Sequence, residues 1–454
     1  MKTPPLAFGA ALAGAVLCTS VFGSDVGKRF PSEMRTLVDK VTGVPINVLT
    51  TGPADDRKIY QTHPQWTADG NYIVFRSTGR AAAAGPQIFA IHETTGEMVQ
   101  LTDGPNSNAS MICIARKSMK IYFLRYSGNA AAAPGMPERP LAQTPAEAQA
   151  RGGFAARGIA QMIELDLEKL FADSAAGKVQ PPSAYERLCG SLPPGMRDSG
   201  GFGLDADEQF AYIGVAGGDT GTHLPPGTEL VKTAEGQRMG AGPAGIRSMN
   251  LQTGELKVVI DTPFNMGHVQ TNPWVPGEIV YCHETGGDAP QRMWTVMADG
   301  SNNRPLYAEN PGDWITHEAV ITKDEVVFNM IGHQPRLRLH PSGIAVINLR
   351  NNQMKIWGQV EDSPPGGRST GGYWHSNGSA DGRWLVGDTF AGNIWLIDRR
   401  NGAQTLLTSG HRMQPDHAHP TFSPDSRRIL IESGLLADGR SLDLMVVPIP
   451  SHLL

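Results

Sequence analysis

The four residues Ser379-Ala380-Asp381-Gly382 decide the fold of this chain. They stand directly before a short run with the composition of a β-strand, residues 383–387. The same pairing of turn and strand recurs at Thr67-Ala68-Asp69-Gly70 and Ser423-Pro424-Asp425-Ser426, with weaker copies at 204–207 and 322–324. A polar turn of this kind joins two strands of a hairpin. The repetition therefore predicts an all-β fold built from one repeated unit.

A second signature follows each copy by about 20 to 30 residues, or by more where a loop is inserted. Thr94-Thr95-Gly96-Glu97 leads into a strand-like run at 99–102, and Gln252-Thr253-Gly254-Glu255 leads into one at 258–260. Repeats of about 40 to 50 residues with four strands each are typical of propeller blades. Seven blades are predicted, at approximately 60–104, 108–190, 200–261, 263–309, 314–359, 371–408 and 415–450.

The segment 44–50, Val-Pro-Ile-Asn-Val-Leu-Thr, resembles an outermost strand but lies before the first blade. We expect it to complete the last blade and so to close the ring. The alternative is two separate β-sandwich domains, but no acidic, basic or serine-rich linker divides the chain. Residues 24–454 are therefore predicted to form a single seven-bladed β-propeller, with inserted loops near 128–158 and 217–245 on one face.

The N-terminus has the pattern of a secretory signal. Residues 6–21 are apolar or small and uncharged, and Val21-Phe22-Gly23 suits cleavage. About 16 such residues are short for a membrane span, which needs roughly 20. We expect residues 1–23 to be removed, the mature protein to be periplasmic or secreted, and no membrane contact after cleavage.

The composition agrees with many strands joined by turns. The 53 glycines and 34 prolines make up about a fifth of the 454 residues, against a usual share of about 12%. A net charge of −5 with 18% charged residues is poorly suited to neutralising phosphates, so no nucleic-acid partner is expected. The mature chain keeps Cys113, Cys189 and Cys282, which allow at most one disulfide and which we interpret as small buried apolar residues.

Histidines share a register with the repeated turn. His375 stands six residues before Asp381, and His419 stands six before Asp425, in consecutive predicted blades. His63 fills the same place in the first blade. The loop that enters the innermost strand of each blade opens on one face of a propeller, so these side chains are expected to converge.

The densest cluster is Gln414-Pro415-Asp416-His417-Ala418-His419. His417 and His419 are two residues apart at the start of a strand, so their side chains point the same way. With His375 from the preceding blade and the amide oxygen of Gln414, they suit a divalent transition metal that keeps open positions for a substrate. The alternative is a set of rim histidines that hydrogen-bond the turn.

Further polar residues fall at equivalent places in the fourth and fifth blades. His268 and His317 enter these blades, and the remaining candidates, His283, Arg292, Arg336 and Arg338, lie in or beside their loops between strands two and three. The arginines would make the site cationic on an acidic protein, which favours a small anionic substrate. No GxSxG elbow, P-loop or Rossmann fingerprint occurs in a strand–turn–helix context.

These residues resemble the oligogalacturonate lyases of polysaccharide lyase family 22. The motifs that carry the resemblance are Gly267-His268, Tyr281-Cys282-His283-Glu284, Arg292-Met293-Trp294, Thr316-His317-Glu318, Gly387-Asp388 and the 414–419 cluster. The resemblance is clearest from about 267 to 450 and less specific in the first half.

The resemblance implies a manganese-type ion bound by His375, Gln414, His417 and His419. It also implies His317 as the general base and Arg292 as the group that stabilises charge. The reaction would be β-elimination on a very short oligogalacturonide. From their places on the same face of the propeller, the residues predicted to bind the substrate are His63, His268, His283, Arg336 and Arg338. Typical members act in the cytoplasm and lack the two inserted loops. A lyase for another uronate, such as a glucuronate-containing oligosaccharide, and a non-catalytic periplasmic propeller resembling TolB are the alternatives.

Overall fold

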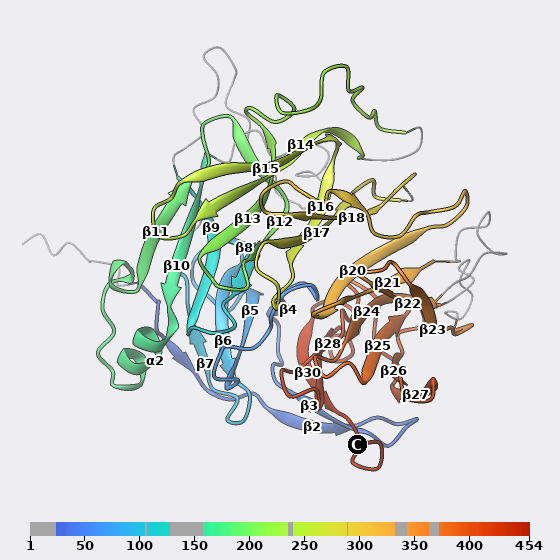
Figure 1. Ribbon diagram of the computed structural model, residues 1–454. Coiled ribbons are helices and arrows are strands. Elements are labelled where there is room, and N and C mark those ends of the chain that lie inside the picture. Colours follow the sequence, from blue (N-terminus) through green and yellow to red (C-terminus); the bar gives the residue numbers. More distant parts are fainter. Residues whose placement is uncertain are drawn as a thin grey trace, which may run out of the picture.

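The strands form seven sheets that follow one another around a ring (Figure 1). The computed structural model describes residues 24–104, 107–127, 158–234, 239–287, 289–331, 343–362 and 372–454. The seven-bladed propeller predicted from the turn signature is confirmed. The strands of blades 1 to 3 are β4 (Asp55–Lys58), β5 (Tyr72–Thr78), β6 (Gln87–His92) and β7 (Met98–Gln100); β8 (Ser107–Ile114), β9 (Lys120–Ser127), β10 (Ile159–Asp166) and β11 (Glu186–Ser191); and β12 (Met196–Leu204), β13 (Phe210–Gly217), β14 (Ala241–Asn250) and β15 (Leu256–Phe264).

Blades 4 to 7 continue the ring with the same antiparallel order. Their strands are β16 (Met266–Thr271), β17 (Glu278–His283), β18 (Met293–Met297) and β19 (Arg304–Pro305); β20 (Ile315–Thr322), β21 (Glu325–Met330), β22 (Gly343–Asn348) and β23 (Met354–Gly358); β24 (Tyr373–Gly378), β25 (Trp384–Thr389), β26 (Ile394–Asp398) and β27 (Ala403–Thr408); and β28 (Thr421–Phe422), β29 (Arg428–Ser433) and β30 (Asp443–Pro448). The first strands of blades 2 to 7 contact one another in sequence, so they line the centre of the ring.

The repeated turn has a side-chain explanation. The Ser379 hydroxyl donates a hydrogen bond to the Asp381 carboxylate at 2.5 Å, and the same carboxylate accepts the backbone N–H of Arg383 at 3.0 Å. The fourth residue of the signature, Gly382, has a φ of +73°, which glycine adopts without steric cost. The signature therefore recurs because one Asx-type turn links the first two strands of several blades.

The N-terminal segment closes the ring, as predicted. β3 (Pro45–Val48) pairs with β30, placing Asn47 opposite Val446, and β2 (Arg35–Val38) extends the sheet outward. β1 (Arg29–Phe30) pairs instead with β7 at the outer edge of blade 1. The N-terminal segment thus joins the two blades that meet at the closure.

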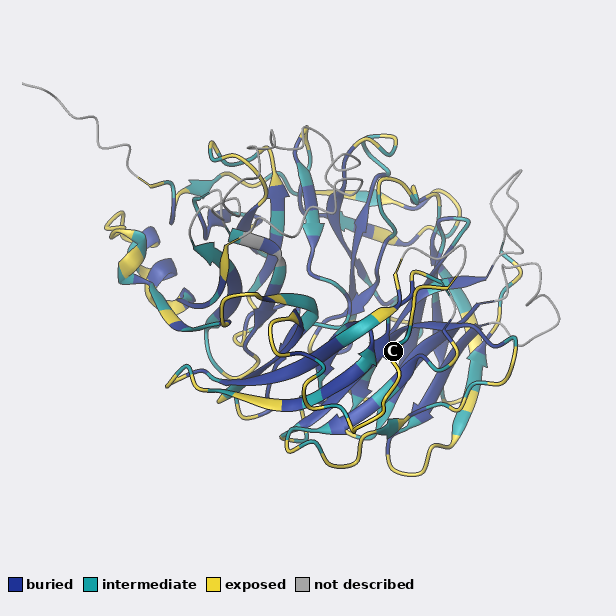
Figure 2. Ribbon diagram, turned by 90° about the horizontal axis from the view of Figure 1, so that it is seen from above, coloured by how far each residue is buried: buried dark blue, intermediate teal, exposed yellow. Residues whose placement is uncertain are grey.

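The hydrophobic core lies between neighbouring blades, where the faces of successive sheets pack together (Figure 2). Leu430 and Val446 of blade 7 pack with Ile73 and Phe75 of blade 1, which completes the circle of apolar contacts. The three cysteines named above are buried and free, in agreement with their interpretation as apolar residues.

A helical segment interrupts the all-β pattern within blade 2. Helix α2 (Leu167–Ala175) and the short 3₁₀ turn η1 (Pro182–Ala184) lie between the last two strands of blade 2. Asp166 caps the helix by accepting the backbone N–H of Lys169. Leu167 and Leu170 are fully buried against blades 1 and 2, so the helix extends the core outward.

Some of the predicted features lie outside the described residues. These are the signal segment 1–23, the inserted loop at 128–157, and Arg336 and Arg338. The second inserted loop joins β13 to β14 and is described except for 235–238. Among the residues that the structure describes, none of the helices has the length and apolar character needed to cross a bilayer.

Candidate functional site

The site is built on irregularities of the innermost strands. In β16 the ladder skips a register between Gly267 and Gln270, and in β20 it skips between Thr316 and Ala319. His268 and His317 occupy these bulges with φ values of +47° and +56°. His419, just before β28, has a φ of +47°. A left-handed backbone costs about 1–3 kcal/mol at a residue other than glycine and tends to mark functional positions.

These strained histidines bring their rings together near the axis of the propeller. The ring of His375, on β24, lies 3.9 Å from that of His419, 5.3 Å from His417 and 4.1 Å from His317, measured between centroids. The His268 ring stacks 6.2 Å from that of His317. The predicted convergence of histidines from blades 4 to 7 is therefore present in the structure.

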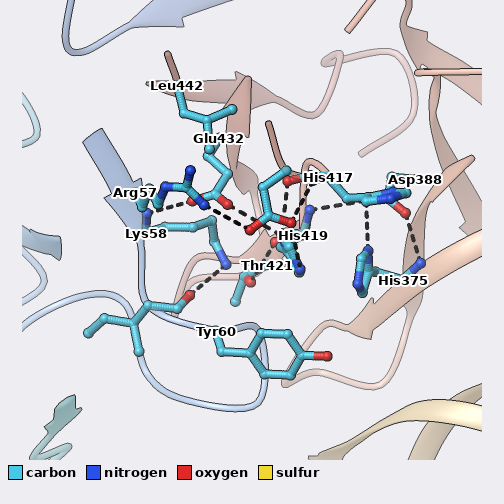
Figure 3. A network of polar contacts seen from close by, with 12 residues as sticks. Arg57, Lys58, Tyr60, His375, Asp388, His417, His419, Thr421, Glu432 and Leu442 are labelled. Carbon is cyan, nitrogen blue, oxygen red and sulfur yellow. Dashed lines mark hydrogen bonds and ion pairs between the residues drawn. The ribbon is translucent and has the colours of Figure 1, made fainter. Parts of the chain in front are cut away.

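Asp388 organises a three-histidine group made of His375, His417 and His419 (Figure 3). Its carboxylate accepts the backbone N–H of His375 at 2.8 Å and of His419 at 3.1 Å, and it accepts the Nδ1–H of His375 at 3.1 Å. The Nδ1–H of His419 donates to the carbonyl oxygen of His417 at 2.9 Å. His375 and His419 therefore keep Nε2 as the nitrogen with a lone pair, which is the form a metal requires.

The donor set fits a divalent metal. The Nδ1 atom of His417 is buried and has no hydrogen-bond partner among the described residues. Ligand atoms of His375, His417 and Asp388 lie within 4.8 Å of one another. An orphaned imidazole nitrogen beside two other imidazoles is the pattern expected of a site for a transition metal. Gln414 differs from the histidines, because its side chain is exposed.

The protonation of these histidines follows from their surroundings. Burial lowers the pKa of His375 well below its usual value, and nearby His419 and His417 lower it further. Burial also lowers the pKa of His417. For His419 burial acts in the same direction, but the hydrogen bond and charge of Glu432 raise its pKa overall. The neutral form, which metal binding needs, is therefore favoured at His375 and His417, whereas Glu432 favours the protonated form of His419.

His317 packs against the three-histidine group from the neighbouring blade. Its Nδ1–H donates to the carbonyl oxygen of Trp374 on the next blade, so Nε2 is the nitrogen able to accept a proton. Burial lowers the pKa of His317 well below its ordinary value, and the neighbouring His375 and His268 act in the same direction. The ring is therefore neutral and oriented by its backbone partner.

Arg292 enters the site from the start of β18 and is 3% exposed. Its Nη2 lies 3.1 Å from Glu284, and its Nε lies 3.5 Å from Glu318. Burial acts to lower the pKa of this guanidinium, but Cys282 and the two glutamates raise it well above its ordinary value. The charge of Arg292 is thus retained and is shared with two carboxylates.

His268 completes this cluster. Its Nδ1–H donates to Glu318 at 3.1 Å, and its Nε2 lies 3.7 Å from Glu284. Glu318 is fully buried, and although burial raises its pKa, the charges of His268 and Arg292 hold that pKa at about 2. Glu318 is therefore an ionised carboxylate that fixes the orientation of the His268 ring.

Two predicted residues have other partners. The Nε2–H of His63 donates to the carbonyl oxygen of Phe202 at 2.7 Å, while its Nδ1 accepts from Thr62. His283 stacks on Phe264 at 4.5 Å, and its Nε2–H donates to the carbonyl oxygen of Gly240 at 3.1 Å. His63 still borders the central channel, which is the space enclosed by the innermost strands. His283 lies beside a separate surface pocket.

Several residues of the site were not assigned from the sequence. Tyr60 lies below the histidines (Figure 3), 5.3 Å from the rings of both His268 and His419. Burial, followed by the charge of Glu318, raises the pKa of Tyr60 well above its usual value. Lys58 is 2% exposed, and burial lowers its pKa to about 7. The signal that could have identified Tyr60 and Lys58 is their nearness in sequence to Gln61 and His63, in the segment where the first blade approaches the central channel.

A cavity of about 680 Å³ opens beside this cluster. Tyr60, His268 and Glu284 form its edge, and it runs toward blades 2 and 3. There the bulge of β12 contains Gly200 and Gly201 in place of a histidine. A Cβ atom on Gly200 would lie 2.5 Å from the carbonyl oxygen of Met266, so only glycine allows this close approach. The histidines and charged residues thus lie on one side of the channel, and the cavity lies on the other side.

Comparison with known proteins gives sequence relatives over part of the chain. No family model matches the chain. Over 218 residues, which are 44% of this chain, it is 25% identical to the oligogalacturonide lyase of Pectobacterium atrosepticum and 26% identical to the oligogalacturonate lyase of Dickeya dadantii. The match covers 54% of each protein, so the chain spans about half the length of the curated relatives it matches.

Solved structures extend the likeness of fold to most of the chain. An oligogalacturonate lyase in complex with manganese superposes with a TM-score of 0.70 at 18% identity, covering 94% of this chain and 99% of that one. The oligogalacturonate lyase of Vibrio parahaemolyticus gives 0.69 at 17% identity, with the same coverage. The resemblance seen in the sequence is therefore confirmed: the chain is similar to oligogalacturonate lyases in part of its sequence and shares their seven-bladed propeller fold.

Proposed function

We propose that this protein is a metal-dependent lyase that cleaves short oligogalacturonides by β-elimination. The observation that carries the proposal is the placement of His317. Its Nδ1–H is held by the carbonyl oxygen of Trp374, its Nε2 is left to accept a proton, and it lies between the three-histidine group and Arg292. The sequence relatives named oligogalacturonate or oligogalacturonide lyase support the choice of reaction.

The reaction has one chemical difficulty, which these residues address. The proton to be removed lies on the carbon next to a carboxylate, and it is barely acidic while that carboxylate keeps its full charge. A divalent ion held by His375, His417 and His419, with Gln414 as a further ligand, would supply positive charge to the carboxylate oxygens. Arg292 would donate hydrogen bonds to the same group, because it still has donors beyond its contact with Glu284.

His317 would remove the proton from C5 of the uronate through Nε2. A positioned general base contributes about 10²–10⁴-fold to such a step. Trp374 keeps the ring in one tautomer, so no reorganisation is needed when the proton arrives. The bond from C4 to the glycosidic oxygen then breaks and a C4–C5 double bond forms.

His317→Ala tests the assignment of the base. We expect the rise in ultraviolet absorbance that accompanies the new double bond to fall by about 10²–10⁴-fold, while bound metal per molecule stays unchanged. His92→Ala is the matched control, because His92 lies on β6 at the outer part of blade 1 and accepts the backbone N–H groups of Thr94 and Thr95. Full turnover by His317→Ala would contradict the assignment.

The identity of the sugar belongs to the same proposal. A panel of digalacturonide, trigalacturonide and matching glucuronate-containing oligosaccharides tests it through the same absorbance. We expect the galacturonides to react, and reaction of the glucuronides alone would assign a different uronate. A protein that binds no transition metal and forms no unsaturated product from any member would be a non-catalytic binding propeller.

We also propose that residues 1–23 direct export and are then removed. The uncharged apolar run at 6–21 followed by Val21-Phe22-Gly23 supports this. N-terminal sequencing of the protein isolated from a periplasmic fraction should begin near Ser24. A full-length chain recovered only from the cytoplasm would contradict it.

A further inference from the structure

The dyad formed by His268 and Glu318 has no task in the proton abstraction assigned to His317. It sits on a strained bulge, with a φ of +47° at His268, and Glu318 is a fully buried carboxylate. The hydrogen bond from Nδ1–H of His268 to Glu318 is 3.1 Å long. A carboxylate that holds one ring nitrogen of a histidine fixes its orientation for proton transfer at the other nitrogen.

The place of His268 in the channel is specific. Its ring lies 6.2 Å from that of His317 and 5.3 Å from that of Tyr60, on the side of the histidine cluster that faces the cavity. Its Nε2 faces Glu284, at 3.7 Å, at the rim of the 680 Å³ cavity. His268 thus lies at the border between the charged groups of blades 4 to 7 and the open space of blades 2 and 3.

This border is where the breaking bond must lie if the proposed function holds. The uronate that loses its proton needs the positive charge near His317 and Arg292. The sugar that leaves needs volume, which the cavity toward Gly200 and Gly201 provides. The glycosidic oxygen joins the two sugars, so it falls between these two regions, beside His268.

Resting on the lyase function proposed above, we propose that His268, oriented by Glu318, is the general acid that protonates the departing glycosidic oxygen. His317 takes the C5 proton, and the electron pair of the C–H bond becomes the C4–C5 double bond. The C4–O4 bond breaks, and its electron pair stays on O4, which takes the proton from Nε2 of His268. His317 ends the step protonated and His268 ends it neutral, so the proton count is unchanged.

His268→Asn is the test variant, because asparagine tolerates the left-handed backbone that this position requires. Two substrates are compared: digalacturonide, whose leaving group is a sugar alkoxide, and a galacturonate that carries a 4-nitrophenyl ether at O4. The nitrophenolate needs no proton to leave. We expect turnover of digalacturonide to fall about 10²–10⁴-fold and turnover of the nitrophenyl ether to fall less than about 10-fold.

Exchange of the C5 hydrogen with deuterium from the solvent gives a second readout. His268→Asn should still catalyse exchange, because it retains the base, whereas His317→Asn should lose exchange and act on neither substrate. Tyr60→Phe removes the hydroxyl group of a second candidate proton donor at the cavity edge and should affect both substrates equally.

Equal losses on the two substrates in His268→Asn, no loss on digalacturonide, or a selective loss in Tyr60→Phe in place of His268→Asn would overturn the assignment of the acid. A wild-type protein that eliminates neither substrate would remove the lyase function itself. The two failures are therefore distinguishable.

Discussion

Two buried arginines in this propeller each lie between two carboxylates, yet their bonding differs. Arg80, at the ring closure, donates from Nε to both oxygens of Asp56 at 2.9 Å, and from its two terminal nitrogens to Glu33 at 2.7 and 2.8 Å. The guanidinium of Arg292, in the channel, makes one hydrogen bond among the described residues, of 3.1 Å to Glu284. Its Nε has no hydrogen-bond partner within the described part of the chain.

The difference is the one expected between a structural ion pair and a group that binds a ligand. A buried donor without a partner costs about 1–3 kcal/mol, so it persists where a ligand completes its bonding. At Arg80, each of the three guanidinium nitrogens donates to a carboxylate oxygen. Among the described residues around Arg292, Nε and one oxygen of Glu318 lack hydrogen bonds, as does Nδ1 of His417 in the three-histidine group. Unpartnered groups thus surround Arg292 in the channel, whereas the donors of Arg80 at the ring closure have partners.

Replacing Arg80 is expected to give the largest effect. Arg80→Met leaves Glu33 and Asp56 without their partner, and breaking a buried ion pair costs about 3–5 kcal/mol of unfolding free energy. Urea denaturation measures this loss. Turnover per folded molecule should not change, because the partners of Arg80, which are Asp56, Glu33 and Thr51, are not among the channel residues assigned to the reaction. A loss below about 1 kcal/mol would show that the closure does not depend on this pair.

Replacing Arg292 should affect activity more than stability. Arg292→Gln alone would leave Glu284 without its arginine partner, so the informative variant is the double substitution Arg292→Gln with Glu284→Gln. Glu318 then keeps its hydrogen bond from His268. We expect kcat to fall about 10²–10³-fold, as for loss of one donor to a developing oxyanion.

The single variant Glu284→Gln measures what loss of that carboxylate contributes on its own. If the double variant loses stability as Arg80→Met does while keeping its turnover, the two arginines have the same structural role and the distinction between them fails.

The blade order, the ring closure and the grouping of histidines could all be predicted from local patterns. The turn at Ser379 and the spacing of His375 and His419 repeat with the blades, so their places in space follow from their places in the sequence. His63 shows the limit of this argument. In blade 1 the strand β4 ends at Lys58, and the chain turns at 61–63, so the same spacing directs the ring to Phe202.

The partners of the predicted residues could not be read from the sequence. Glu284 directly follows His283, and Glu318 directly follows His317. In a regular strand, neighbouring side chains point to opposite faces, so each glutamate would face away from the histidine before it. The bulge in β20 breaks this alternation and brings Glu318 to His268 and Arg292. Irregular backbone of this kind is set by packing between blades, which leaves no local signature.

A smaller effect is expected from Asp388, the group that orients the proposed metal ligands. Asp388→Asn keeps the size of the side chain but loses one of the acceptors for His375 and His419. Loss of such an outer partner typically weakens metal binding about 10–100-fold. Manganese titration of the metal-free protein measures the change. Asp381→Asn, in the turn of the same blade, is the control and should bind metal as the wild type does.

The smallest effect concerns Asp443, which is the strictest test of the distinction. It lies on β30 at the ring closure, and neither of its carboxyl oxygens has a hydrogen-bond partner among the described residues. Burial, followed by the charge of Asp56, raises its pKa to about 7, while Arg80 acts in the opposite direction and Glu33 adds to the rise. An under-bonded group therefore also occurs outside the channel.

The sign of its pH dependence follows from this rise. Between about pH 4 and pH 7 the unfolded state has lost the Asp443 proton and the folded state keeps it, so this group makes stability fall as pH increases. Asp443→Asn should therefore raise the unfolding free energy by about 1–2 kcal/mol at pH 8 and by little at pH 4. Urea denaturation at the two pH values measures the difference.

Asp425→Asn provides the opposite case. Burial raises the pKa of Asp425, but its bonds to Ser423 and to the backbone of Arg427 lower it overall. That variant should be less stable than the wild type at neutral pH, and the difference should vanish as the pH falls. Both variants should keep full turnover at a pH where they are folded. A loss of activity in Asp443→Asn would mean that unsatisfied groups at the closure also serve the channel, and bonding alone would no longer separate the two regions.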